Sequence, residues 1–120
     1  MIKLASVKVL IVDDNELNAR ALKRALSRRH EVWTTQTAEE ALAMVERDPP
    51  DAVVCDFELG QGTSAGFLRL ITEQFPSVRR VLYSASRPEQ WVTLVAEKLI
   101  DIALAKPTSL DQLMAAIERA

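Results

Sequence analysis

The chain is short of the residues that build disulfides, zinc sites and membrane spans. Its 120 residues include one cysteine and one histidine, so an internal disulfide is excluded and a zinc site of clustered cysteines and histidines is not favoured. Cys55 lies inside an apolar run and is expected to be a small buried hydrophobic residue. No apolar run approaches the ~18–20 residues that cross a bilayer, and residues 1–6 lack the apolar core of a signal peptide. We therefore expect a cytoplasmic protein with no membrane partner.

The chain also lacks a strong excess of charge of either sign. Its formal net charge is −2, which gives no reason to expect direct binding to nucleic acid. Hydrophobic residues make up 48% of the chain and charged residues 27%, as in ordinary globular domains. A length of 120 residues suits one domain with one real core.

Glycine is scarce, and its three occurrences are gathered in one segment. Gly60, Gly62 and Gly66 lie in the sequence GQGTSAG at residues 60–66. Such a concentration predicts a flexible loop here. We expect the loop to be mobile on a fast timescale unless a metal or phosphate orders it.

Five segments have the composition of β-strands, and the segments between them have the periodicity of helices. The expected strands are residues 7–12, 31–35, 52–55, 80–83 and 102–105. The helices are expected to begin after Asn15, near Thr37, before Phe67, at Ser86 and at Ser109, and most of these starts carry capping residues. Apolar residues at helical spacing, among them Leu17 in the first helix and Trp91, Val92, Val95 and Leu99 in the fourth, are expected to face the core.

The strict alternation of five strands and five helices predicts the fold class. It requires an α/β domain in which a doubly wound parallel sheet carries helices on both faces. Ligands of such sheets bind outside the carboxyl ends of the strands. The polar residues expected at those ends are Asp13, Asp14, Asp56, Ser84 and Lys106.

These residues together suit phosphoryl transfer. Three carboxylates at one edge repel one another unless cations hold them together, and an oxygen-only cluster suits Mg²⁺. Lys106 supplies a further positive charge and Ser84 a hydroxyl donor. The central carboxylate, Asp56, can itself be the nucleophile and form an aspartyl phosphate.

The order and spacing of these residues resemble the receiver domain of two-component response regulators, over essentially the whole chain. The motifs that carry the resemblance are VDDNELN at 12–18, Asp56, Ser84 and Lys106-Pro107. The resemblance implies a flavodoxin-like (βα)5 fold with the five-stranded parallel sheet in the order 2-1-3-4-5. It also implies one receiver domain over residues 1–120 with no output domain. Whether this is a single-domain regulator or a receiver cut from a larger protein stays open.

The resemblance further implies a function. Asp56 is expected to accept a phosphoryl group from a histidine kinase or phosphotransfer protein in a Mg²⁺-dependent reaction. The domain would then switch its contacts with a downstream protein, whose identity the sequence does not give. Such a domain catalyses at most its own phosphorylation and dephosphorylation.

The resemblance assigns a role to each site residue. Asp14 and Asp56 would hold Mg²⁺ through their side chains with help from Asp13, and Glu58 would contribute its backbone carbonyl. Ser84 would bond a phosphoryl oxygen, Lys106 would pair with the phosphate, and the bond before Pro107 would be cis. Glu58 and Ser86 occupy positions that tune the loss of the phosphoryl group to water.

Two features depart from the family's pattern. The family usually has Tyr or Phe three residues before the lysine, where this chain has Ala103. That aromatic couples phosphorylation to the surface of the last elements, so the coupling here must be weaker or carried by another group, for which Trp91 and Tyr83 are candidates. The loop after Asp56 is also longer by about two residues.

Two alternative functions stay open on the sequence. A pseudo-receiver would keep the fold as a binding module that works without phosphate, as the absent aromatic at Ala103 allows. A small Mg²⁺-dependent phosphatase would use Asp56 as nucleophile and Glu58 as general acid and base.

Two further charged features are expected at the surface. A basic stripe on the first helix contains Arg20, Lys23, Arg24 and Arg28. We interpret it as a solvated face, with docking of a phosphotransfer partner as the sharper alternative. His30 follows the end of that helix and is expected to be a solvated cation.

Overall fold

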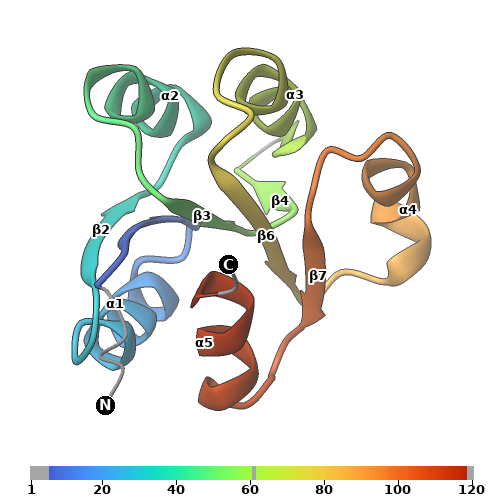
Figure 1. The fold of residues 1–120 in the computed structure, drawn as a ribbon. Helices are drawn as coiled ribbons and strands as arrows, with labels where there is room; N and C mark the ends of the chain where they lie inside the picture. Colours follow the sequence, from blue (N-terminus) through green and yellow to red (C-terminus); the bar gives the residue numbers. More distant parts are fainter. Residues whose placement is uncertain (1–5, 61, 119–120) are drawn as a thin grey trace.

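The computed structural model describes residues 6–60 and 62–118, and a five-stranded parallel sheet runs through its centre (Figure 1). The sheet has the order β2-β1-β3-β6-β7. Its strands are β1 (Lys8–Val12), β2 (Glu31–Thr35), β3 (Ala52–Cys55), β6 (Arg79–Ser84) and β7 (Ile102–Ala105). Because β4 and β5 form a separate hairpin, this is the order 2-1-3-4-5 of a flavodoxin-like fold, as predicted.

Helices cover both faces of the sheet, which divides the core in two (Figure 1). The helices are α1 (Glu16–Leu26), α2 (Ala38–Arg47), α3 (Ala65–Gln74), α4 (Pro88–Ala96) and α5 (Leu110–Glu118). On one face, α1 and α5 pack against the sheet around Ile11, Val54 and Leu113. On the other, α2, α3 and α4 pack around Leu10, Val53 and Leu68. The central strands are buried on both faces, which explains their unbroken apolar sequences.

The predicted helix caps are largely present. The Asn15 side chain accepts a hydrogen bond from the Asn18 N–H at 3.0 Å, and the Thr37 hydroxyl accepts one from the Glu40 N–H at 3.1 Å. Each bond satisfies a backbone donor that the first helical turn leaves free. Helix α4 differs from the prediction: its cap is Arg87, one residue after Ser86, and its first residue is Pro88.

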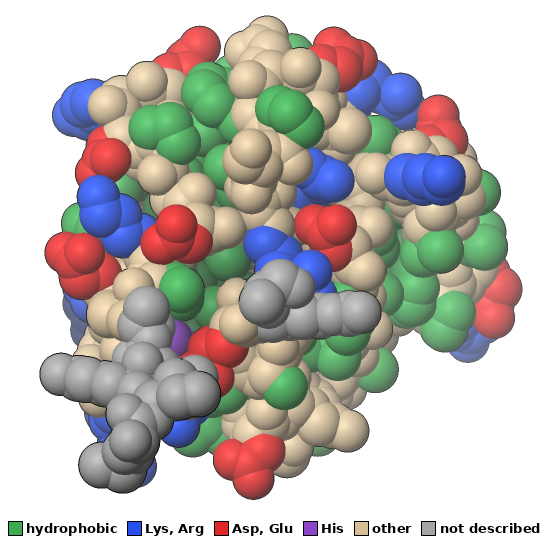
Figure 2. Space-filling model, in the orientation of Figure 1, with side chains coloured by type: hydrophobic (Ala, Val, Ile, Leu, Met, Phe, Trp, Pro, Cys, Tyr) green, Lys and Arg blue, Asp and Glu red, His purple; other side chains and the backbone are tan. Residues whose placement is uncertain are grey.

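The predicted inward faces of α1 and α4 are wrong in part. Leu17 is 76% exposed, because α1 faces the sheet through Ala19 and Leu26. Helix α4 buries Leu94, while Val92 and Val95 are 57% and 49% exposed. Figure 2 shows hydrophobic side chains gathered at its right, over α4, on a face where acidic and basic side chains are otherwise interspersed. Leu99 is buried, but in the segment after α4 has ended.

The glycine-rich segment contributes to a short two-stranded hairpin and a helix start, where the sequence predicts a loop. Strands β4 (Glu58–Leu59) and β5 (Gly62–Thr63) pair antiparallel as a short hairpin. Gly60 turns the chain with φ +61°, a conformation that favours glycine. Gly66 lies inside α3, which begins at Ala65. The three glycines therefore serve a hairpin and a helix start rather than one uniform loop.

His30 is buried, which corrects the expectation of a solvated cation. Its side chain is fully enclosed, and its Nε2 lies 2.7 Å from the Glu118 carboxylate. Its Nδ1 accepts a hydrogen bond from the Val7 N–H at 3.2 Å, so we assign the ring hydrogen to Nε2. His30 thus joins the end of α1, the start of β1 and the end of α5.

Among the residues with described positions, no helix is long and apolar enough to cross a membrane.

Candidate functional site

The carboxyl ends of β1, β3, β6 and β7 meet at one edge of the sheet. Strand register brings them level, since Val12 pairs with Cys55, Cys55 with Leu82, and Ser84 with Ala105. The residues that follow these ends surround a cavity of about 510 Å³. Its walls include all five polar residues singled out in the sequence, Asp13, Asp14, Asp56, Ser84 and Lys106.

Lys106 joins two of the carboxylates. Its ammonium nitrogen lies 3.1 Å from an oxygen of Asp13 and 3.1 Å from an oxygen of Asp56. Burial by itself lowers the pKa of Lys106, but hydrogen bonds and charge from Asp56 and Asp13 outweigh burial and hold the pKa above its usual value. Lys106 is therefore a permanent cation between two acids that are brought together by β1 and β3.

Asp13 and Asp14 follow β1 but differ in their surroundings. Asp13 is buried, and its second oxygen accepts a hydrogen bond from the Asn15 N–H at 2.9 Å. Asp14 is exposed, and its Oδ2 accepts one from the Gly60 N–H at 2.9 Å. The hairpin that follows β3 is thereby tied to the acidic side of the cavity.

Asp56 is partly buried at the centre of this edge. Its side chain is 18% exposed, so one end reaches the cavity while the backbone is held by an N–H bond to the Val12 carbonyl at 3.0 Å. Beneath it, Cys55 is fully buried as predicted. Burial, with the nearby charges of Asp56 and Asp13, raises the pKa of the Cys55 thiol to about 12 although Ser64 acts in the opposite sense. Cys55 is thus a packing residue rather than a nucleophile.

The opposite wall of the cavity is formed by hydroxyl groups and Glu58. Ser84 is 1% exposed, and its Oγ accepts a hydrogen bond from the Ser86 N–H at 3.1 Å. The Ser86 hydroxyl donates to the Glu58 carboxylate at 3.3 Å. A hydrogen bond therefore joins Glu58 to Ser86, 28 residues away, and both line the cavity together with Asp56.

Some lining residues were missed in the sequence. Asn18, Arg87 and Gln90 also border the cavity. Asn18 lies one turn after the Asn15 cap, and Arg87 and Gln90 belong to the start of α4, where their side chains looked like ordinary helix-surface positions. The peptide bond between Lys106 and Pro107 is cis, and Ala103 is a partly buried residue of β7.

The donor set suits a hard cation. Within residues 6–60 and 62–118, no three acidic, histidine or cysteine side chains already converge as a metal site. Lys106 instead bridges Asp13 and Asp56, while Asp14 contacts Gly60. Nevertheless, the three carboxylates all line the same cavity and offer only oxygen, which is the ligand chemistry of Mg²⁺ and Ca²⁺. The residues therefore fit a divalent cation that would compete with Lys106 and Gly60 for carboxylate oxygens.

Comparison with known proteins places the chain in a family. The family model for the response regulator receiver domain matches residues 9–118. The chain belongs to the response regulator receiver family. This agrees with the resemblance in its motifs and with the order of its strands.

The curated relatives are regulators that contain more chain than this one. The hydrogenase transcriptional regulatory protein HoxA of Cupriavidus necator is 31% identical over 113 residues, which are 93% of this chain and 23% of HoxA. The chain thus spans about a quarter of that relative.

Solved structures share the fold. A CheY-like receiver domain protein from Methanospirillum hungatei JF-1 has a TM-score of 0.87 at 21% identity. The match covers 94% of this chain and 91% of that protein's chain. A response regulator from Burkholderia pseudomallei, with a phosphorylated aspartic acid, calcium ion and citrate, has a TM-score of 0.85 at 24% identity. The match covers 93% of this chain and 66% of that protein's chain. At these identities the likeness establishes the fold of this receiver.

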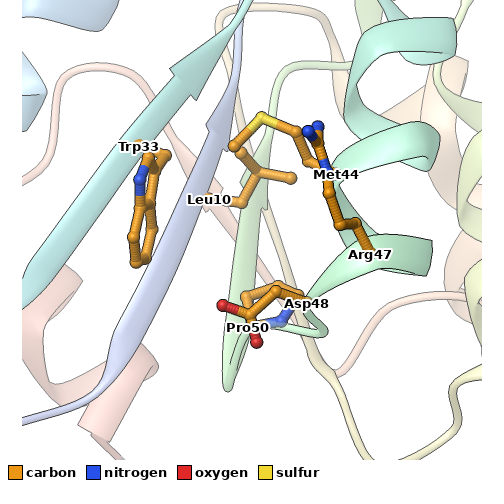
Figure 3. Close-up of a pocket in the computed structure, with 6 residues that line it drawn as sticks. All are labelled: Leu10, Trp33, Met44, Arg47, Asp48 and Pro50. Atoms are coloured by element: carbon orange, nitrogen blue, oxygen red, sulfur yellow. The ribbon is translucent and has the colours of Figure 1, made fainter.

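Two of the further cavities among the described residues flank the sheet. One, of about 270 Å³, lies between the edge strand β2 and helix α2 (Figure 3). Figure 3 shows Trp33 on one side of it, Met44 and Arg47 on the other, and Leu10 at its back. The other, about 610 Å³, is an apolar groove between α1 and the start of α5 that reaches Asp13 and Lys106. This groove shares Asp13, Asn18 and Lys106 with the acidic site.

Proposed function

We propose that this receiver accepts a phosphoryl group on Asp56 from a phosphohistidine of a kinase or phosphotransfer protein, and that it does so in the cytoplasm. The supporting observation is the Lys106 ammonium, 3.1 Å from the carboxylates of both Asp13 and Asp56. This places one fixed cation beside the expected nucleophile, in a cavity roomy enough for a phosphoryl group.

The reaction is a transfer between two nucleophiles. An oxygen of Asp56 attacks phosphorus, the new O–P bond forms, and the N–P bond to the donor histidine breaks with its electrons left on nitrogen. Lys106 and the Ser84 hydroxyl are placed to bind the oxygens that carry the transferred charge. Asp13, Asp14, Asp56 and the Glu58 carbonyl would hold Mg²⁺, which neutralises charge on the transferred group when it is bound.

A docking surface for the donor protein borders the site. The apolar groove between α1 and α5 includes Leu22, Tyr83 and Pro107 and ends at Lys106. On the same helix, Leu17 has an exposed side chain, and Lys23 and Arg24 are exposed basic residues. A donor helix with an apolar stripe and acidic flanks would complement it.

The test is phosphorylation of the purified protein. Incubation with Mg²⁺ and a small phosphodonor is expected to add one phosphoryl group to the intact mass, and Asp56→Ala is expected to remove this gain. Asp111→Asn, which changes an exposed carboxylate on α5, is the matched control and should still be labelled. A folded wild-type protein that gains no phosphoryl group, and whose structure beryllofluoride leaves unchanged, would support a pseudo-receiver instead.

The phosphatase alternative makes a different prediction. It requires many turnovers of a phosphate ester and their loss in Glu58→Gln. Glu58 is exposed and its carboxylate already accepts the Ser86 hydroxyl, so we place it as a group that acts on the phosphorylated receiver rather than on a separate substrate.

A further inference from the structure

The segment that carries Ser84 is connected to helix α4 by two successive hydrogen bonds. The Ser86 N–H donates to the Ser84 Oγ at 3.1 Å. The Ser86 carbonyl accepts a hydrogen bond from the indole Nε1–H of Trp91 at 3.2 Å. One short segment thus connects Ser84 to a side chain of α4.

Trp91 is placed to respond to a displacement of Ser84. It is partly buried and packs against the core on the α2–α4 side of the sheet, as do Ala103 of β7 and Phe57, which follows Asp56. A tryptophan has two side-chain torsions and can change rotamer, whereas the methyl group of Ala103 cannot. Of these two residues, Trp91 is therefore the one whose side chain can move.

Tyr83, the other aromatic near the site, is held elsewhere. It packs against the core on the α1–α5 side of the sheet. The Lys106 nitrogen lies 5.4 Å from the centre of its ring, within the range of a cation–π contact. Tyr83 thus belongs to the side of the molecule opposite α4.

We propose that Trp91 is the residue through which occupation of the phosphorylation site is read at helix α4, in the place that Ala103 leaves without an aromatic ring. This inference rests on the proposed function. When Ser84 changes rotamer so that its hydroxyl donates to a phosphoryl oxygen, its Oγ moves and the bond from the Ser86 N–H lengthens or breaks. The Ser86 peptide then moves, and the Trp91 indole moves with the carbonyl to which it donates. Because Trp91 is part of α4, the helix that exposes Val92 and Val95 changes its position or its stability.

The first test uses the fluorescence of Trp91. The other tryptophan, Trp33, lies on β2 at the opposite edge of the sheet, in the cavity beside α2 (Figure 3). In Trp33→Phe, Trp91 is the single indole. Addition of Mg²⁺ with beryllofluoride is expected to shift the emission of this variant. In the matched variant Trp91→Phe, Trp33 is the single tryptophan, and its emission is expected to show no shift. Unchanged emission of Trp91 in protein that has bound beryllofluoride would overturn the inference.

The second test asks whether Trp91 carries the signal or merely reports it. Amide hydrogen exchange across residues 88–96 is measured with and without Mg²⁺ and beryllofluoride. We expect a change in wild type and in Trp33→Phe, and loss of that change in Trp91→Phe, while both variants still gain one phosphoryl group by mass. Equal responses of α4 in Trp91→Phe and wild type would overturn the inference and leave the proposed function intact. A wild-type protein that gains no phosphoryl group would overturn the proposed function and with it the role of Trp91.

Discussion

The Lys106 ammonium nitrogen lies 3.1 Å from a carboxylate oxygen of Asp56, although the two residues are 50 positions apart in the chain. Parallel pairing of β1, β3, β6 and β7 makes this contact possible, because each strand ends at the same edge. The contact also affects the charge of the site. The single positive charge of Lys106 balances only one of the two carboxylates that it contacts, so the cluster keeps a net negative charge. That residual negative charge is what a divalent cation would neutralise.

Removal of the Lys106 charge tests its role in transfer. We expect Lys106→Gln to slow phosphorylation of Asp56 by a small phosphodonor about 10²-fold, the usual effect of losing one group that stabilises transferred charge. Lys98→Gln, at an exposed lysine after α4, should keep the wild-type rate. The rate is followed by intact mass over time. Equal rates in the two variants would show that Lys106 has only a structural role.

The lifetime of the phosphorylated state should depend on Glu58. One of its oxygens accepts the Ser86 hydroxyl, and the carboxylate borders the cavity around Asp56. It is placed to accept a hydrogen bond from an attacking water, so we expect Glu58→Ala to lengthen the lifetime by less than the ~10²-fold effect of a full general base. Decay of the phosphorylated mass after removal of the donor gives the lifetime. Glu89→Ala, on the exposed side of α4, is the control, and a shorter lifetime in Glu58→Ala would contradict the assignment.

The proposed docking surface predicts that a charge change on α1 alters the rate of phosphotransfer from a donor protein but not the rate from a small phosphodonor. Lys23→Glu reverses an exposed charge on α1 and leaves the acidic cavity untouched. We expect slower phosphotransfer from a phosphorylated histidine protein, with the loss relieved at high salt because exposed charges are screened. The rate from a small phosphodonor should stay the same. Slowing with both donors would place the effect in the site rather than in docking.

The contacts of Glu118 predict a pH dependence of stability. Burial raises the pKa of its carboxyl, but hydrogen bonds from Arg29 and His30, together with the charge of Arg29, outweigh burial and hold the pKa below its usual value. A carboxyl with a lowered pKa in the folded state stabilises the fold above its unfolded pKa, and this stability is lost as the pH falls through the folded pKa. We expect Glu118→Gln to lower the free energy of unfolding by about 1 kcal/mol at neutral pH and by less at acid pH, where the wild-type carboxyl becomes protonated.

Urea unfolding at both pH values measures that difference. Glu89→Gln, at an exposed glutamate of α4, controls for the loss of a surface charge. A deficit in Glu118→Gln that is equally large at acid and neutral pH would mean that packing, rather than charge, accounts for the stability.

The sequence was sufficient to predict the sheet and the acidic cluster. The apolar runs before Asp13, Asp56 and Ser84 mark strands buried on both faces, and parallel topology then brings their ends together. These features depend on local composition and on one general rule of topology, so one chain without its structure reveals them.

The features that were missed depend on contacts between distant parts of the chain. Periodicity places Leu17, Val92 and Val95 near an apolar stripe but does not give the rotation of the helix about its axis, and in the structure all three are exposed. His30 is buried because Glu118, 88 residues away, lies against it. The β4–β5 hairpin is held partly by the bond from Gly60 to Asp14, a contact between a loop and the end of another strand that composition alone does not indicate.

The most direct test of the account is to locate the phosphoryl group. The protein is incubated with Mg²⁺ and a small phosphodonor, digested, and its peptides are sequenced by tandem mass spectrometry. We predict a single phosphoryl group on Asp56, with none on Asp13, Asp14 or the serines of the cavity. A phosphoryl group on any of those residues instead, or unmodified Asp56 in a folded protein, would contradict the central claim.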